Sequence, residues 1–199
     1  MRELVSESQE VAVTDNSDLG KKILIAGHGG KSTLAQAVAA DLELPYVELD
    51  ALSHQPNWVE TPKDEFRELV RQVLVDNPEG WVIDGNYAND LEGMVAEQAD
   101  TIIYVNMPYT LMMWRIFWRS VARARDKKLI CGENVETWRK AFFSRDSLLW
   151  FLIKTRKNFY GRRTERLMAW AKTRETRVIE LGSRAALNRF YAERRLTRD

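Results

Sequence analysis

The sequence predicts an α/β fold in which helices cover both faces of a parallel, five-stranded sheet. Short apolar runs alternate with longer segments of helical spacing along the 199 residues, a pattern typical of parallel sheets. A glycine cluster joins the first such run to the first helical segment. Because no linker divides the chain, we expect one domain over 21–199, preceded by a polar, flexible extension over 1–20.

The first half of the chain is expected to supply four strands and three helices. Apolar runs predict strands, and apolar residues three or four apart predict helices. Thr61-Pro62 followed by two acidic residues is a helix start. These signals predict strands at 23–26, 45–49, 81–83 and 101–105, and helices at 31–42, 62–76 and near 90–97.

The second half is expected to be mainly helical, with a lid region over about 109–173. We expect a long helix over 109–125, a loop over 126–133, helices over 134–146 and 147–173, a fifth strand over 177–181 and a final helix after Gly182-Ser183. In the first of these helices, Trp114, Trp118 and Val121 share a stripe that is expected to pack inward.

Composition narrows the classes of function. One cysteine excludes an internal disulfide framework, and two histidines without ligand spacing argue against a zinc enzyme. The longest apolar run has six residues and no secretory leader is evident, so a cytoplasmic protein without a membrane span is expected. Residues 1–108 carry a net charge of −13 and residues 109–199 one of +14, which indicates either an anion-binding surface or two halves that neutralise each other.

The stretch from Lys22 to Leu34, KILIAGHGGKSTL, predicts a phosphate-binding loop. Glycines allow backbone N–H groups to approach an anion, the following helix adds its dipole, and a lysine adds charge. ATP would contact Gly27, Gly29, Gly30, Lys31, Ser32 and Thr33, with the Ser32 hydroxyl on Mg²⁺. The usual spacing, G-x-x-x-x-G-K-[ST], would require glycine where Ile25 stands. Either the first strand ends at Leu24, or the loop is two residues short; we favour the second, because Ile suits a strand.

Two carboxylates follow predicted strands and would reach the same edge of the sheet as the glycine loop. Asp84 would hold Mg²⁺ directly or through water, and Asp50 would orient an attacking hydroxyl or accept its proton. Each has a structural alternative, as a turn or cap residue. His54 and Trp58, in the loop after Asp50, would shape a second-substrate pocket, and His28 is expected to occupy a turn.

Basic residues form two clusters in the second half. Arg115, Arg119 and Arg123 lie on one stripe of the predicted 109–125 helix, where they would contact phosphate or remain solvated. The second cluster, within 156–163, is expected to be a solvated face or part of a mobile lid.

Several segments resemble the adenylate-kinase-related P-loop proteins known as DNA topology modulation proteins. They are KKILIAG…GKSTLA, VELDAL…NWVETPKDEF, GWVIDGNY and ADTIIYVNMP, followed by an Arg-rich helix. The resemblance implies an adenylate-kinase-like, three-layer α/β/α fold with strand order 2-3-1-4-5, binding ATP and Mg²⁺. By similarity, Arg115 would contact the adenine side of ATP and Arg119 would occupy the next lid-hinge position. Asn86-Tyr87-Ala88 stands where adenylate kinases have Phe-Pro-Arg, so the arginine that holds a monophosphate there is missing.

Three functions are therefore weighed. The first is an ATP-dependent phosphotransferase with a nucleotide, nucleoside or other small hydroxyl compound as acceptor, for which Lys31, Asp50, Asp84 and Arg119 are the candidate catalytic residues. The second is a nucleotide-regulated nucleic-acid-binding protein, supported by the basic half but by no recognisable DNA-reading motif. The third is a P-loop protein that has lost turnover, suggested by the short loop.

Overall fold

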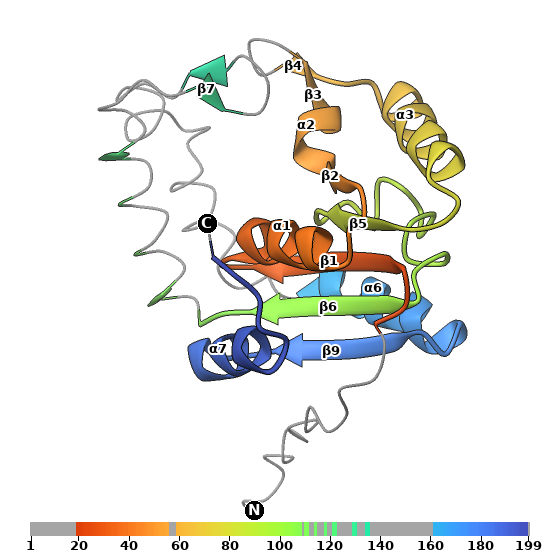
Figure 1. Ribbon diagram of the computed structural model, residues 1–199. Coiled ribbons are helices and arrows are strands. Elements are labelled where there is room, and N and C mark those ends of the chain that lie inside the picture. The colour runs from red at the N-terminus through yellow and green to blue at the C-terminus, as the bar shows by residue number, and fades with distance from the viewer. Residues whose placement is uncertain are drawn as a thin grey trace, which may run out of the picture.

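The central sheet of the protein has five parallel strands. The computed structural model describes residues 19–55, 59–108, 110–111, 114, 118, 121–122, 129–130, 134–135 and 161–198. Its sheet strands are β1 (Lys22–His28), β2 (Tyr46–Glu48), β5 (Trp81–Asp84), β6 (Thr101–Asn106) and β9 (Arg177–Leu181), in the spatial order β2-β5-β1-β6-β9 (Figure 1). Counted along the chain within this sheet, the order is 2-3-1-4-5, as expected.

Strand β1 lies at the centre of the sheet and pairs with a strand on each side. On one side it pairs with β5 from Lys22↔Trp81 to Ile25↔Asp84. On the other side it pairs with β6 as far as His28↔Asn106. The β6 ladder thus continues for three residues beyond the β5 ladder, so β1 projects past the end of β5 at the carboxyl edge.

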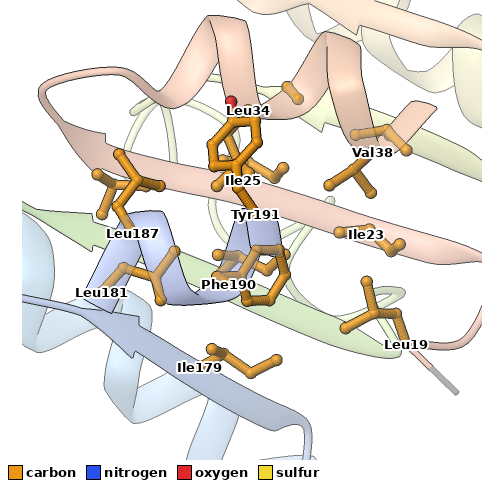
Figure 2. Close-up of a cluster of buried hydrophobic side chains, with 14 of the residues drawn as sticks. Leu19, Ile23, Ile25, Leu34, Val38, Ile179, Leu181, Leu187, Phe190 and Tyr191 are labelled. Atoms are coloured by element: carbon orange, nitrogen blue, oxygen red, sulfur yellow. The ribbon is translucent and has the colours of Figure 1, made fainter. Parts of the chain in front are cut away.

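Helices cover both faces of the sheet, which gives the three layers expected. Alternate residues of β1 point to opposite faces: Ile23 and Ile25 contribute to one core cluster, whereas Leu24 and Ala26 contribute to the other. On the first face, α1 (Lys31–Asp41) and α7 (Arg184–Glu193) bury their apolar sides, as Figure 2 shows. On the second face, α3 (Lys63–Asp76) and α6 (Gly161–Thr173) do the same.

Short elements complete the described chain. Helix α2 (Leu49–Ser53) follows β2 directly and leads into an antiparallel pair, β3 (His54–Gln55) and β4 (Val59–Glu60). Strands β7 (Leu129–Ile130) and β8 (Asn134–Val135) form a second antiparallel pair. None of the helices in the described ranges is long and apolar enough to cross a lipid bilayer.

Several expectations about the elements were wrong. The expected strand over 45–49 ends at Glu48, because Leu49 already begins α2. The expected helix near 90–97 is a series of hydrogen-bonded turns, interrupted where Glu92 and Gly93 adopt positive φ of 49° and 84°. Residues 134–135, expected to start a helix, belong to β8.

Two expectations about packing also failed. Trp114 and Trp118 are helical but 62% and 51% exposed, so they do not pack inward. Their rings meet edge to face at 5.6 Å instead. At the other end of the chain, Leu19 is only 2% exposed within the first core cluster, so the ordered domain begins at least two residues before the expected boundary at 21. Residues 1–18 lie outside the described residues.

Candidate functional site

The connection from β1 to α1 is unusually short. Strand β1 continues through Gly27 and His28, so only Gly29 and Gly30 separate it from the first residue of α1, Lys31. Ile25 lies within the strand and pairs on both sides. The alternative that the strand ends at Leu24 is therefore wrong, and the loop is short, as we favoured. His28 ends the strand and does not occupy a turn, contrary to expectation.

At two of these positions the backbone geometry requires glycine. Gly27 has φ of 102°, and a Cβ placed there would lie 2.1 Å from the Val105 carbonyl oxygen, so a side chain would clash with the backbone of β6. Gly30 stands at the N-cap of α1 with φ of 110°, in the left-handed region where glycine carries no penalty. The chain can therefore turn from strand to helix in two residues only with glycine at these points.

The N-terminus of α1 points its first N–H groups out of the helix beside this connection. The first three to four N–H groups of any helix have no partner within it, and among the described residues no side chain caps α1. Its first turn contains no acidic residue, whereas Lys31 contributes a positive charge. Ser32 and Thr33, in the same turn, are half-buried and exposed respectively. This combination favours an anion.

Lys31 and Asp84 form an ion pair at the carboxyl edge of the sheet. The Lys31 Nζ lies 2.6 Å from Asp84 Oδ1. Asp84 has no exposed side-chain surface and Lys31 only 16%, so a lone charge at either position would be poorly solvated and each group compensates the other. Lys31, which the sequence assigned to the phosphates, and Asp84, which it assigned to the metal, are therefore in direct contact.

A tyrosine from β2 contacts the other oxygen of Asp84. The Tyr46 hydroxyl donates to Asp84 Oδ2 at 3.4 Å. Burial, followed by the negative charge of Asp84, raises the pKa of Tyr46 above its ordinary value, so the phenol stays protonated and remains a donor. Nothing in the sequence singled out Tyr46, because a tyrosine near the end of a strand is usually a packing residue.

The side chain of Asn86 binds the backbone of Gly27, near the carboxyl end of β1. Its side-chain Oδ1 accepts from the Gly27 N–H at 2.7 Å, and its Nδ2 donates to the Gly27 carbonyl at 2.8 Å. Both backbone polar groups of Gly27 are therefore satisfied by one side chain. Gly27 was expected to donate to phosphate, but in this structure its N–H donates to Asn86 Oδ1.

Asp50 does not share the surroundings of Asp84. It lies in the first turn of α2, half-buried, and no hydrogen bond or ion pair joins its carboxylate to another described residue. Its carbonyl accepts from the Ser53 hydroxyl at 3.1 Å. Asp50 lies two residues beyond the end of β2, a strand that is two positions from β1 in the sheet.

A polar cluster follows Asp50. The Ser53 Oγ lies 2.8 Å from His54 Nδ1 and 2.7 Å from the Tyr87 hydroxyl, which comes from the chain leaving β5. Beside this cluster a pocket is lined mainly by apolar residues, including Leu49, Tyr87 and Tyr104.

The oxygen donors at the edge fit a magnesium ion. Mg²⁺ is normally held by one or two carboxylates, substrate phosphates and waters, and Ser32 with Asp84 supplies a hydroxyl and a carboxylate of that kind. Within the described ranges no cluster of three or more His, Cys, Asp or Glu side chains forms a self-sufficient metal site.

Several residues with predicted roles lie outside the described residues. They are Arg115, Arg119, Arg123 and Trp58. The structure therefore describes the glycine turn and the Lys31–Asp84 pair, but not the arginines that the sequence assigned to the nucleotide.

Comparison with known proteins adds no assignment. No family model matches the chain, and no curated protein matches its sequence. The argument for function therefore depends on the geometry of the site.

Proposed function

We propose that this protein is an ATP-binding, adenylate-kinase-like P-loop phosphotransferase that transfers the γ-phosphate of ATP to a hydroxyl group of a small molecule. One observation carries the proposal: the Lys31–Asp84 ion pair lies where a glycine turn meets the N-terminus of α1, which no side chain of the described residues caps. A cation, a buried carboxylate and the N–H groups of a helix N-terminus at the carboxyl edge of a parallel sheet are the parts that phosphoryl transfer requires.

Each group has a distinct role in this proposal. The N–H groups from Gly29 to Thr33 bind the phosphates, and Lys31 moves from Asp84 to a phosphate oxygen when ATP binds. Asp84, released from Lys31, and the Ser32 hydroxyl would hold Mg²⁺, which would supply positive charge beside the phosphates. Tyr46 continues to donate to Asp84 and keeps its carboxylate oriented.

Transfer proceeds by attack of the acceptor hydroxyl oxygen on the γ-phosphorus, with cleavage of the bond to the β-phosphate oxygen and departure of ADP. Asp50 accepts the hydroxyl proton. Its half-buried position and its place beyond β2 support this role. Arg115 and Arg119 would contact the nucleotide and the transferred phosphate.

The segment after β5 bears on the acceptor. In this chain Asn86 takes the position next to Asp84-Gly85, and its amide is bound to Gly27. No arginine follows within this segment, Gly85–Asp90. An acceptor phosphate would therefore lack the cation that adenylate kinases provide here, which favours an acceptor held through hydroxyl groups.

The test is transfer of the γ-phosphate from labelled ATP to a panel of nucleotides, nucleosides and sugars. Wild-type protein should label at least one acceptor. Lys31→Met should abolish labelling, and Asp50→Asn should slow it by about 10²-fold with little change in ATP binding. Labelling that Lys31→Met leaves intact would refute the proposal.

A second function is favoured by the two-residue connection itself. With Gly27 bonded to Asn86, fewer N–H groups enclose the phosphates than in a full-length loop. Such a site suits nucleotide binding without turnover. Mg·ATP binding at wild type, together with no transfer to any acceptor and no hydrolysis, would favour this second function over the first.

A further inference from the structure

The side chain of Asn86 takes the place of a missing strand beside β1. The ladder between β1 and β5 ends at Ile25↔Asp84, and the Gly85 N–H still donates to the Ile25 carbonyl at 3.2 Å. The chain then leaves the sheet. At the next position of β1 that faces this side, Gly27, one carboxamide supplies both the acceptor and the donor that a neighbouring strand would have supplied.

The Asn86 side chain is presented from a well-anchored segment. The residue before it is bonded to Ile25 through its N–H. The residue after it, Tyr87, places its hydroxyl 2.7 Å from Ser53 Oγ and packs its ring edge-to-face on Phe66 at 5.1 Å. Because both neighbours are fixed, the carboxamide has little freedom to leave Gly27.

We propose that Asn86 is a positioning residue for the phosphate site: its carboxamide fixes the end of β1, and so sets where the Gly29-Gly30 turn begins and how the first turn of α1 is aimed. The proposal rests on the proposed function. On its other side β1 is held by β6 through Gly27↔Val105 and His28↔Asn106. Among the described residues, Asn86 is the side chain that bonds the Gly27 backbone on the β5 side.

A short connection makes this support necessary. Two glycines, both with positive φ near 100°, join the strand to the helix, and glycine loses more backbone freedom on ordering than other residues. A longer loop could adjust to a phosphate after binding, whereas a two-residue turn transmits any displacement of Gly27 directly to Lys31. Preorganised N–H groups bind an anion more tightly than groups that must first be ordered.

The experiment compares Asn86→Ala with Asn77→Ala. Asn77 also donates through Nδ2 to a backbone carbonyl, that of Val73 at 2.8 Å, at the end of α3. Two properties are measured on each variant: the Kd for Mg·ATP by calorimetry, and the amide hydrogen exchange of Gly27, Gly29 and Gly30 in ligand-free protein. Melting temperatures are recorded for the wild type and for both variants.

Asn86→Ala should weaken Mg·ATP binding about tenfold or more and accelerate exchange at all three glycines. Asn77→Ala should leave both unchanged, even where it lowers the melting temperature as much. Binding by Asn86→Ala within about twofold of wild type, at a standard error below that range, would overturn the inference.

Failure of the proposed function has a different signature. If wild-type protein binds no Mg·ATP, the proposed function fails, and the inference is judged by exchange alone: unchanged protection of Gly29 and Gly30 in Asn86→Ala overturns it. If Asn86→Ala does not fold, Asn86→Asp is used for the exchange measurement. That variant keeps the acceptor for the Gly27 N–H and loses the donor to its carbonyl, so it should loosen the turn partially.

Discussion

Asp84 and Asp50 follow similar stretches of sequence but differ in their burial and in their contacts. Both were expected to follow an apolar strand directly, and both were expected at one edge of the sheet. Asp84 is the last residue of β5, fully buried, and bonded to Lys31 and Tyr46. Asp50 is the second residue of a short helix and half-buried, with a carboxylate that contacts none of the other described residues through a hydrogen bond or ion pair.

The difference follows from the position of each strand in the sheet. β5 lies between β1 and β2, so the end of β5 is enclosed by neighbours. β2 is an edge strand of three half-buried residues, and the chain leaves it at once for α2. The carboxylate that follows the inner strand is therefore buried against Lys31 and Tyr46, whereas the one that follows the edge strand is only half-buried.

The largest expected effect comes from removing the cation beside Asp84. Lys31→Ala leaves a buried carboxylate unpaired and should lower the free energy of unfolding by about 3–5 kcal/mol. The matched control is Lys63→Ala, which breaks an exposed pair with Asp90 at 3.5 Å and should cost no more than about 1 kcal/mol. Urea unfolding of both variants provides the measurement; similar losses would remove the distinction between the buried and the exposed pair.

The carboxylates themselves provide the next comparison. Asp84→Asn loses a charged hydrogen bond to Lys31 and should destabilise the protein by about 2 kcal/mol. Asp50→Asn should change the free energy of unfolding by no more than about 0.5 kcal/mol. Chemical denaturation measures both, and an Asp50→Asn variant as unstable as Asp84→Asn would mean that Asp50 has a structural partner.

Lengthening the glycine connection should affect binding more than stability. Two residues inserted between His28 and Gly29 would add N–H groups around the β-phosphate and should tighten Mg·ATP binding by roughly tenfold. Calorimetry on the inserted variant gives the answer. Unchanged or weaker binding would indicate that the two-residue turn is already optimal for its ligand.

The smallest effect concerns the tyrosine on Asp84. Because the folded protein raises the pKa of Tyr46 above 10, the unfolded chain ionises first as the pH rises. Stability from this residue is fully present below pH 10 and is lost as pH rises above it. The free energy of unfolding of Tyr46→Phe should therefore fall less steeply than that of wild type above pH 10. Parallel curves would show that Tyr46 does not contribute.

Much of the fold was predictable because it depends on local patterns. The five sheet strands, α1 and α3 follow from apolar runs and helical spacing, and the meeting of Lys31 with Asp84 follows from the parallel topology. The strand order was expected from the family resemblance alone. The start of α2 at Leu49 was not predictable, because that apolar residue continues the strand pattern equally well.

The remaining features depend on tertiary contacts. The pairing of Asn86 with Gly27 joins residues 59 positions apart through a side chain, and no local pattern marks an asparagine for that role. The exposure of Trp114 and Trp118 contradicts their apolar character, since burial depends on what the rest of the fold brings against them. Sequence reasoning therefore located the glycine turn and the Lys31–Asp84 pair but not the side-chain contacts that hold this part of the structure in place.

The most direct test of the central claim is a titration of isotope-labelled protein with Mg·ATP, followed through the backbone amide resonances. Binding at the glycine turn predicts saturable shifts, with a Kd in the micromolar range, that are largest at Gly29, Gly30, Lys31, Ser32 and Thr33. Smaller shifts should reach Gly27 and Asp84. No saturable shift, or shifts confined to residues away from the β1–α1 connection, would contradict the account.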